Sequence, residues 1–208
     1  MKLTDFFDKT YCVNLDRRID RWTDSMNEFK RFNLIEVERV SAIDGKTIQQ
    51  ENTQINKSEI ALILTNIKII EKAKKEGLKS ILILEDDVEF TDEINNISEY
   101  FKFLPNDWDM IYFGGNHNTH MNIEPPIIIN EKVSKLHHTF STHCVGIKNT
   151  AYNIILDNLK HPTKQLDAIY SDLQKTLNVY SFYPMIASQR IGFSDIQEME
   201  VDYKWLIK

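Results

Sequence analysis

The chain has 208 residues, of which 42% are hydrophobic and 27% are charged. These values are typical of a soluble folded protein and exclude a disordered chain, a collagen and a membrane bundle. Lysine and arginine number 25 against 31 aspartates and glutamates, so the formal net charge is −6. This is the wrong sign for broad binding to nucleic-acid phosphates. Only Cys12 and Cys144 are present, which excludes a disulfide framework and a four-cysteine zinc site and leaves a single bridge open.

The sequence contains no apolar run long enough for a signal peptide or for the ~20-residue span of a membrane helix. We therefore expect a cytoplasmic protein without a transmembrane segment, with peripheral attachment to the inner face of a membrane left open. Glycine (6) and proline (5) are scarce, and no repeat or low-complexity segment divides the chain. One domain over residues 1–208 is predicted. The abundance of isoleucine, lysine and asparagine indicates a bacterial or viral source.

The first predicted elements are a strand, a helix and a second strand. Residues 11–15 predict a short strand, and the apolar positions that then recur at helical spacing are Ile19, Trp22, Met26 and Phe29. Residues 35–43 predict the second strand, which ends at the turn dipeptide Asp44-Gly45.

A longer helix and a buried strand follow. Ser58 is a suitable N-cap, and Gly77 a suitable stop, for an amphipathic helix. The continuous apolar run 80–84 predicts a strand buried on both faces, the pattern of a parallel sheet covered by helices. The later predicted elements are a short helix through Ile97 and Phe101, a strand over 109–113, two strands within 127–147, helices over 151–159 and 166–177, a strand over 179–187 and an irregular tail. Together they predict an α/β fold with a mixed sheet.

The candidate chemistry rests on carboxylates, because the sequence lacks the common phosphate-loop, nucleophile-elbow and zinc-protease motifs. Glu85-Asp86-Asp87 directly follows the strand 80–84, and open α/β sheets bind ligands at the carboxyl ends of their strands. Adjacent carboxylates repel one another unless a cation neutralises them, and oxygen ligands suit Mg²⁺ or Mn²⁺, which would bind a diphosphate. The alternative is a solvated acidic turn at the start of the next helix.

Two groups of polar residues lie near the first strand. Arg17, Arg18 and Arg21 follow it, where their guanidinium groups would hold phosphate oxygens or lie in solvent. Asn14 is polar within an apolar strand, so we expect its amide to make specific hydrogen bonds, either to a ligand or to the neighbouring backbone.

Further candidates lie in the second half of the chain. His137, His138 and His143 flank a predicted strand and would ligate a metal, contact a phosphate or satisfy polar groups in the core. Asp167 opens a predicted helix, where the helix dipole favours an acid; alternatively, it would accept a proton from an acceptor hydroxyl. Ser194-Asp195 lies in a tail that would close over a ligand.

Five blocks occur in order along the chain: TYCVNLDRRIDRW, ERVSAIDGK, SEIALILTNIKIIEKAKKEG, SILILEDDVEF and SDI. Together, over residues 11–195, they resemble glycosyltransferase family 25, which holds bacterial lipooligosaccharide galactosyltransferases and collagen hydroxylysine galactosyltransferases. The resemblance implies a single-domain GT-A fold, a Rossmann-like α/β/α sandwich. It also implies inverting transfer of a sugar, usually galactose, from a UDP-sugar to a hydroxyl of a glycan or of hydroxylysine, with Mn²⁺ or Mg²⁺ as cofactor.

The resemblance also assigns roles to residues. Those expected to hold the nucleotide sugar are Val13, Asn14, Leu15, Arg17, Arg21, Asp44, Glu85, Asp86, Ser194 and Asp195. Asp86 and Asp87 fall on the acidic motif that bridges metal and diphosphate, so Asp87 is expected to be catalytic. Asp167 matches an aspartate that opens a late helix in relatives and is the candidate catalytic base.

One departure from the family pattern suggests a second hypothesis. Relatives commonly carry Gly-Glu-Ile followed by Ser-His, whereas this chain has Ser58-Glu59-Ile60 followed by Thr65-Asn66. Loss of the histidine suggests a degenerate member that binds a nucleotide sugar or a glycan without transferring it. A phosphoryl-transfer enzyme is disfavoured, because no phosphate-cradling glycine loop follows the strand. Loops such as 116–126 would select the donor sugar and the acceptor.

Overall fold

The computed structural model describes residues 1–49, 54–117 and 125–204. In these ranges the chain forms an eight-stranded sheet and two two-stranded sheets. The strands of the large sheet, in spatial order, are β2 (Val37–Ser41), β1 (Lys9–Asn14), β3 (Ser80–Glu85), β8 (Cys144–Lys148), β5 (Met110–Tyr112), β9 (Val179–Phe182), β7 (Val133–Lys135) and β6 (Ile127–Ile128). The small sheets pair β4 (Val88–Phe90) with β10 (Ala187–Gln189), and β11 (Gly192–Ser194) with β12 (Met199–Val201).

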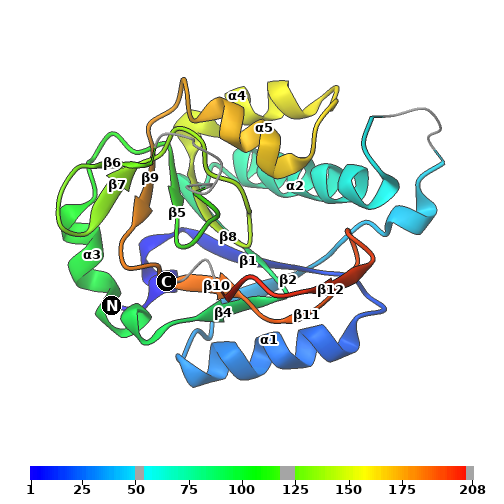
Figure 1. Ribbon diagram of the computed structural model, residues 1–208, viewed down its shortest axis with the longest axis horizontal. Coiled ribbons are helices and arrows are strands. Elements are labelled where there is room, and N and C mark those ends of the chain that lie inside the picture. The colour runs from blue at the N-terminus through cyan, green and yellow to red at the C-terminus, as the bar shows by residue number, and fades with distance from the viewer. Residues whose placement is uncertain (50–53, 118–124, 205–208) are drawn as a thin grey trace.

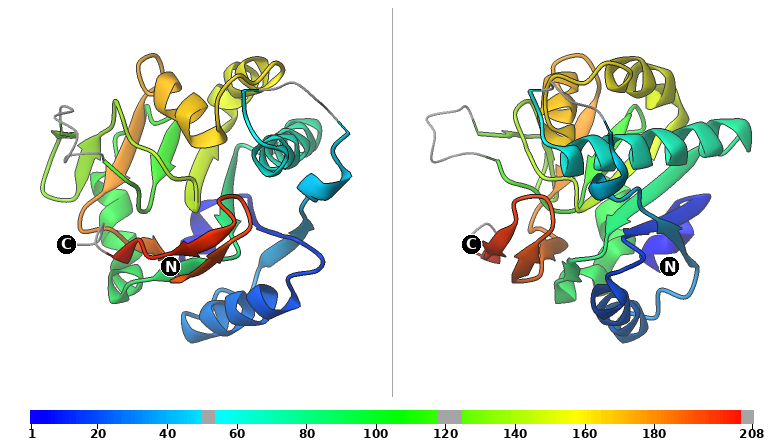
Figure 2. Two further views of the ribbon diagram at one scale, coloured as in Figure 1. Left: turned by 45° about the vertical axis from the view of Figure 1, so that its right-hand side comes forward. Right: turned by 90° about the vertical axis from the view of Figure 1, so that its right-hand side faces the viewer.

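Helices cover both faces of the large sheet (Figures 1 and 2). The helices are α1 (Ile19–Arg31), α2 (Lys57–Lys75), α3 (Ile97–Phe103), α4 (Asn149–Leu159) and α5 (Leu166–Leu173), and short 3₁₀ turns span Leu3–Phe6, Gly45–Thr47 and Asp92–Asn96. One hydrophobic core joins the sheet to α2, α4 and α5, and a second joins it to α1 and α3. The predicted α/β class with a mixed sheet is confirmed.

β3 shows how the sequence produces these two cores. Ile81 and Ile83 belong to the core beneath α2, whereas Leu82 and Leu84 belong to the core beneath α1, because successive side chains of a strand point to opposite faces. The prediction of a strand buried on both faces is thus confirmed. The strands on either side of it are not both parallel to it, however, since β3 pairs in parallel with β1 and antiparallel with β8.

The directions of the strands place several loops at one edge of the sheet. β1, β2 and β3 run in parallel, and β5 runs in the same direction because both it and β3 are antiparallel to β8. The segments that follow these four strands therefore meet at their carboxyl ends, and the loop that precedes β8 reaches the same edge.

Two helices differ from the predictions, α2 in its N-cap and α1 in its buried face. The N-cap of α2 is Asn56, not Ser58: the Asn56 side chain accepts from the Glu59 amide at 2.9 Å, and the Glu59 carboxylate accepts from the Asn56 amide at 2.8 Å. This reciprocal pair satisfies two free donors, which a cap at Ser58 would not. In α1, the predicted apolar positions Ile19 and Met26 are 70% and 48% exposed. The buried side of this helix runs through Ser25, Glu28 and the predicted Phe29.

The short strands of the second half were only partly predicted. Residues 127–147 contain three strands, not two. The predicted strand 179–187 is two strands, since Pro184 has no N–H to donate to a ladder and the chain leaves the large sheet after β9. The predicted helix 166–177 becomes a series of tighter turns after Leu173.

The predicted irregular tail instead contains a hairpin, β11–β12. Cys12 and Cys144 are both buried and free, so the bridge that the sequence left open is not formed. In the described part of the chain no helix is long and apolar enough to cross a membrane.

Candidate active site

The carboxyl end of β3 opens into a cavity of about 340 Å³. Glu85 is the last residue of β3, and Asp86 and Asp87 follow in the turn to β4. All three line the cavity, together with residues from the ends of β1 and β2, the start of α5 and the β11–β12 hairpin. The acidic motif therefore lines a cavity and does not form a solvated turn.

Hydrogen bonds and ion pairs hold the two aspartates in place. Asp86 is 7% exposed; its Oδ2 accepts from Asn14 Nδ2 at 2.6 Å, and its Oδ1 lies 2.8 Å from Arg21 Nη2. The same Arg21 nitrogen lies 2.6 Å from Asp87 Oδ2. Burial raises the pKa of Asp86 to about 6, although Arg21 and Asn14 oppose the shift. Asn14 makes the specific hydrogen bonds that its place in an apolar strand predicted.

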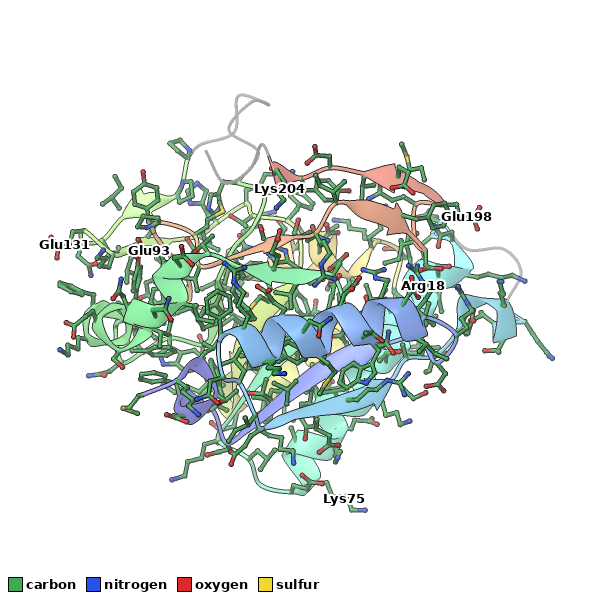
Figure 3. All side chains as sticks on the ribbon, turned by 90° about the horizontal axis from the view of Figure 1, so that it is seen from below. Arg18, Lys75, Glu93, Glu131, Glu198 and Lys204 are labelled. Atoms are coloured by element: carbon green, nitrogen blue, oxygen red, sulfur yellow. The ribbon has the colours of Figure 1, made fainter. Side chains whose placement is uncertain are left out.

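Asp195, in the turn of the C-terminal hairpin, meets the arginines that follow β1. Arg17 Nη1 lies 2.7 Å from its Oδ1, Arg18 forms an ion pair with its Oδ2, and Arg21 Nη1 lies 3.8 Å from the same oxygen. Arg17 also reaches Asp44 Oδ2 at 2.9 Å. Figure 3 shows Arg18 at the same end of the molecule as Glu198 of the hairpin turn. The hairpin is thus attached across the cavity by charge.

A second group of polar residues comes from the loop before β8. Thr142 Oγ1 donates to Glu85 Oε1 at 2.6 Å, and the Ser141 amide donates to Asp167 Oδ2 at 3.3 Å. Burial, with the charge of Asp87, raises the pKa of Glu85 to about 8. Burial also raises the pKa of Asp167.

Asp86 and Asp87 would hold a divalent cation only together with ligands from the substrate. Among the described residues no group of three or more His, Cys, Asp and Glu side chains is placed to hold a metal ion by itself. Asp87 Oδ1, however, is buried without a hydrogen-bond partner in the described structure. Mg²⁺ is usually bound by one or two carboxylates together with substrate phosphates and water, and this oxygen would supply one such ligand.

All of the predicted site residues line the cavity: Val13, Asn14, Leu15, Arg17, Arg21, Asp44, Glu85, Asp86, Asp87, Asp167, Ser194 and Asp195. The candidate histidines His137, His138 and His143 do not line it. Asn66 is 4% exposed, donates to the carbonyl of Leu62 at 3.0 Å and also lies away from the cavity. The departure at this position therefore changes the interior of the protein and not a cavity wall.

Several cavity residues were not singled out from the sequence, among them Glu59, Phe140, Ser141, Thr142, Gln165 and Gln189. Ser141 and Thr142 reach the site because β8 is antiparallel to its neighbours, which no local pattern reveals. Gln189 arrives through the pairing of β10 with β4. Glu59 was within reach of sequence reasoning, since Asn56 and Glu59 have the spacing of a capping box.

A mixed α/β sandwich with an acidic, arginine-lined cavity at the carboxyl ends of its strands agrees with the predicted GT-A class. Residues 7–161 match the family described as glycosyltransferase family 25 (LPS biosynthesis protein). The chain belongs to this family.

Two relatives carry related names. The chain is 25% identical over 142 residues to procollagen galactosyltransferase 1 of Danio rerio, which covers 58% of this chain and 23% of that protein. It is 27% identical over 136 residues to a glycosyltransferase 25 family member of Drosophila pseudoobscura pseudoobscura, covering 54% of this chain and 21% of that protein. The matched region is thus less than a quarter of each relative's length.

A solved structure is also similar. A glycosyltransferase involved in the glycosylation of the major capsid of PBCV-1 aligns with a TM-score of 0.49 at 11% identity, over 81% of this chain and 74% of that one.

Proposed function

We propose that this chain is an inverting glycosyltransferase that moves galactose from UDP-galactose to a hydroxyl group of a glycan or of hydroxylysine. The observation that carries the proposal is the set of side chains that line one cavity. Asp86, Asp87, Arg17 and Arg21 line it. Asp167 also lines it, and this carboxylate forms no ion pair with a lysine or arginine in the described structure. Inverting transfer needs both kinds of group, because a diphosphate leaves from one side of the sugar while a base acts on the other.

The donor's diphosphate would lie between the arginines and the aspartates. Arg17 and Arg21 line the cavity and present donors for phosphate oxygens. Asp86 and Asp87 would hold Mn²⁺ or Mg²⁺, with Asp87 Oδ1 available as a ligand. When bound, the cation would stabilise the negative charge of the departing nucleoside diphosphate. Arg21 would keep the two carboxylates in place throughout.

Asp167 would remove the proton of the acceptor hydroxyl. Burial raises its pKa, which makes its ionised form a stronger base, and the Ser141 amide at 3.3 Å fixes the position of Oδ2. The second oxygen of this carboxylate would be left to the acceptor. A base of this kind typically contributes 10²–10⁴-fold to the rate.

The choice of galactose rests on relatives. The Danio rerio protein is named a procollagen galactosyltransferase, and the family description names LPS biosynthesis; these support hydroxylysine and glycan acceptors respectively. The alternative, a member that binds without transfer, was suggested by Asn66. Because Asn66 is buried away from the cavity, its identity does not argue against transfer.

Release of UDP from UDP-sugars, with and without Mn²⁺ and with neutral glycans or hydroxylysine peptides as acceptors, tests the proposal. We expect acceptor-dependent release from UDP-galactose and a loss of about 10²-fold or more in Asp167→Asn. Asp172→Asn is the matched control, because Asp172 lies on the same helix and is exposed and paired with lysines. Nucleotide-sugar binding without turnover for any donor and acceptor would favour the non-transferring alternative.

A further inference from the structure

Arg39 reaches the acidic site from the outer side of the sheet. It lies on β2, the edge strand beside β1, and its side chain is 32% exposed. Arg39 Nε lies 2.9 Å and Nη2 lies 2.6 Å from Asn14 Oδ1, so both nitrogens donate to one oxygen. Arg39 is not among the residues that line the cavity. Its hydrogen bonds to a residue that does line the cavity are those to Asn14.

The contact with Arg39 determines which end of the Asn14 amide faces Asp86. An asparagine side chain accepts only at Oδ1 and donates only at Nδ2, whereas a guanidinium donates and never accepts. Arg39 therefore requires Oδ1 to face β2. Nδ2 then faces the other way, where it donates to Asp86 Oδ2 at 2.6 Å and to the carbonyl of Arg18 at 3.1 Å. With the amide turned over, Oδ1 would face the carboxylate and repel it.

Arg39 is itself held in place by two neighbours. Its Nη2 lies 3.0 Å from Asp16 Oδ1, and its guanidinium lies 5.5 Å from the centroid of the Trp22 ring. Asp16 in turn accepts from Ser41 Oγ at 2.6 Å through its other oxygen. The hydrogen-bond chain from Arg39 through Asn14 to Asp86 is therefore complete without a ligand.

We propose that Arg39 is a positioning residue of the donor site: by fixing the orientation of the Asn14 amide, it holds the Asp86 carboxylate ready to bind the metal and diphosphate of the donor. The identity of the ligand rests on the proposed function. The hydrogen-bond chain is a property of the free protein and is testable on its own.

The first experiment measures the affinity for UDP in the presence of Mn²⁺ by calorimetry. We expect Arg39→Met to weaken binding about tenfold, the usual order for a hydrogen bond to a charged group. Arg39→Lys keeps a cationic donor for Oδ1 and should restore affinity to within about threefold. Arg31→Met is the matched control, because Arg31 also pairs with an exposed aspartate, Asp92 at 3.5 Å, and lies 4.6 Å from the centroid of the Phe32 ring. It should leave the affinity unchanged.

A double-mutant cycle tests whether the effect passes through Asn14. In an Asn14→Ala background, Arg39→Met should cause no further loss of affinity. Tenfold losses in both backgrounds would overturn the proposal, since Arg39 would then act on the ligand by another route. Unchanged affinity in Arg39→Met with Asn14 intact would overturn it as well.

Side-chain amide NMR of the free protein separates this inference from the proposed function. The Asn14 NH₂ resonances should move in Arg39→Met, with partial restoration in Arg39→Lys and no change in Arg31→Met. Unmoved resonances would refute the hydrogen-bond chain. If the wild-type protein bound no nucleotide while the resonances moved as expected, the proposed function would be wrong and the role of Arg39 in orienting Asn14 would stand.

Discussion

Two walls of the cavity differ in whether their carboxylates are paired with arginines. In the arginine wall, formed by Arg17, Arg21, Asp86, Asp87 and Asp195, every carboxylate meets at least one guanidinium. The α5 wall is formed by Ser141, Thr142, Gln165 and Asp167, and among the described residues none of its members is a lysine or an arginine. The partner of Asp167 there is a backbone amide.

Under the proposed function, this difference would separate binding of the donor from proton transfer. Burial raises the pKa of Asp86 and of Asp167 alike, but a guanidinium opposes the shift at Asp86, whereas backbone amides alone oppose it at Asp167. The two walls have different origins: Arg17, Arg21, Asp86 and Asp87 follow the parallel strands β1 and β3, whereas the α5 wall comes from the loop before the antiparallel β8 and from the start of α5. Changes confined to one wall should therefore have distinct signatures.

The largest effect is expected in the arginine wall from Asp87→Asn. The amide keeps the shape of the side chain and removes the charge that would hold the cation, so kcat should fall about 10²–10³-fold. Steady-state UDP release checks this, with circular dichroism to verify the fold. Asp92→Asn serves as the control, since the Asp92 side chain is 88% exposed. Turnover within tenfold of wild type would exclude the proposed role of Asp87.

Asp195→Asn should break the attachment of the hairpin to the same wall. The Asp195 side chain is 12% exposed and contacts three arginines, and its loss leaves their charges facing one another. We expect a destabilisation of about 2 kcal/mol, which lowers the melting midpoint by roughly 4–8 °C in a chain of this size. Added UDP should recover more stability in this variant than in wild type, because its diphosphate would neutralise the freed arginines. Equal midpoints for the two proteins would contradict this account.

The sequence predicted the parts of the fold that local patterns determine. The apolar run that forms β3 and the helical spacing within α2 identified those elements, and the mixed α/β class followed from their order. The hairpin β11–β12 was missed because strands of three residues are too short to show alternation. Likewise, the antiparallel direction of β8 depends on how distant segments pair.

The candidate site shows the same limit. Asp86, Asp87 and Arg21 were identified because they directly follow predicted strands, whose carboxyl ends share one edge. Ser141 and Thr142 were not, since they precede a strand whose direction was unknown. The charge of Asp195 was noted, but its pairing with the arginines after β1 joins residues far apart in the chain and had no sequence signal.

The raised pKa values of the carboxyls at the end of β3 should make the stability of the protein depend on pH. Burial raises the pKa of Glu85 from 4.5 to about 8 and that of Asp86 from 3.8 to about 6. Between pH 4.5 and about 8 for Glu85, and between pH 3.8 and about 6 for Asp86, the folded state keeps a proton that the unfolded state has released. The stabilisation present at low pH is therefore lost as the pH rises. The free energy of unfolding, measured with urea, should therefore fall between pH 5 and pH 8. This fall should be smaller in Glu85→Gln. An identical pH profile in that variant would exclude the raised pKa of Glu85.

The smallest functional effect is expected from Asn66→His, which restores the residue that relatives commonly carry. Asn66 is 4% exposed and lies outside both walls, so the KM for the donor should change less than twofold. The larger ring must fit a packed interior, and the variant should lose on the order of 1 kcal/mol of stability. Chemical unfolding and donor kinetics on the same sample separate the two quantities. A KM that changed tenfold with stability intact would mean that α2 transmits the identity of this residue to the cavity, and the distinction between walls and interior would then fail at this position.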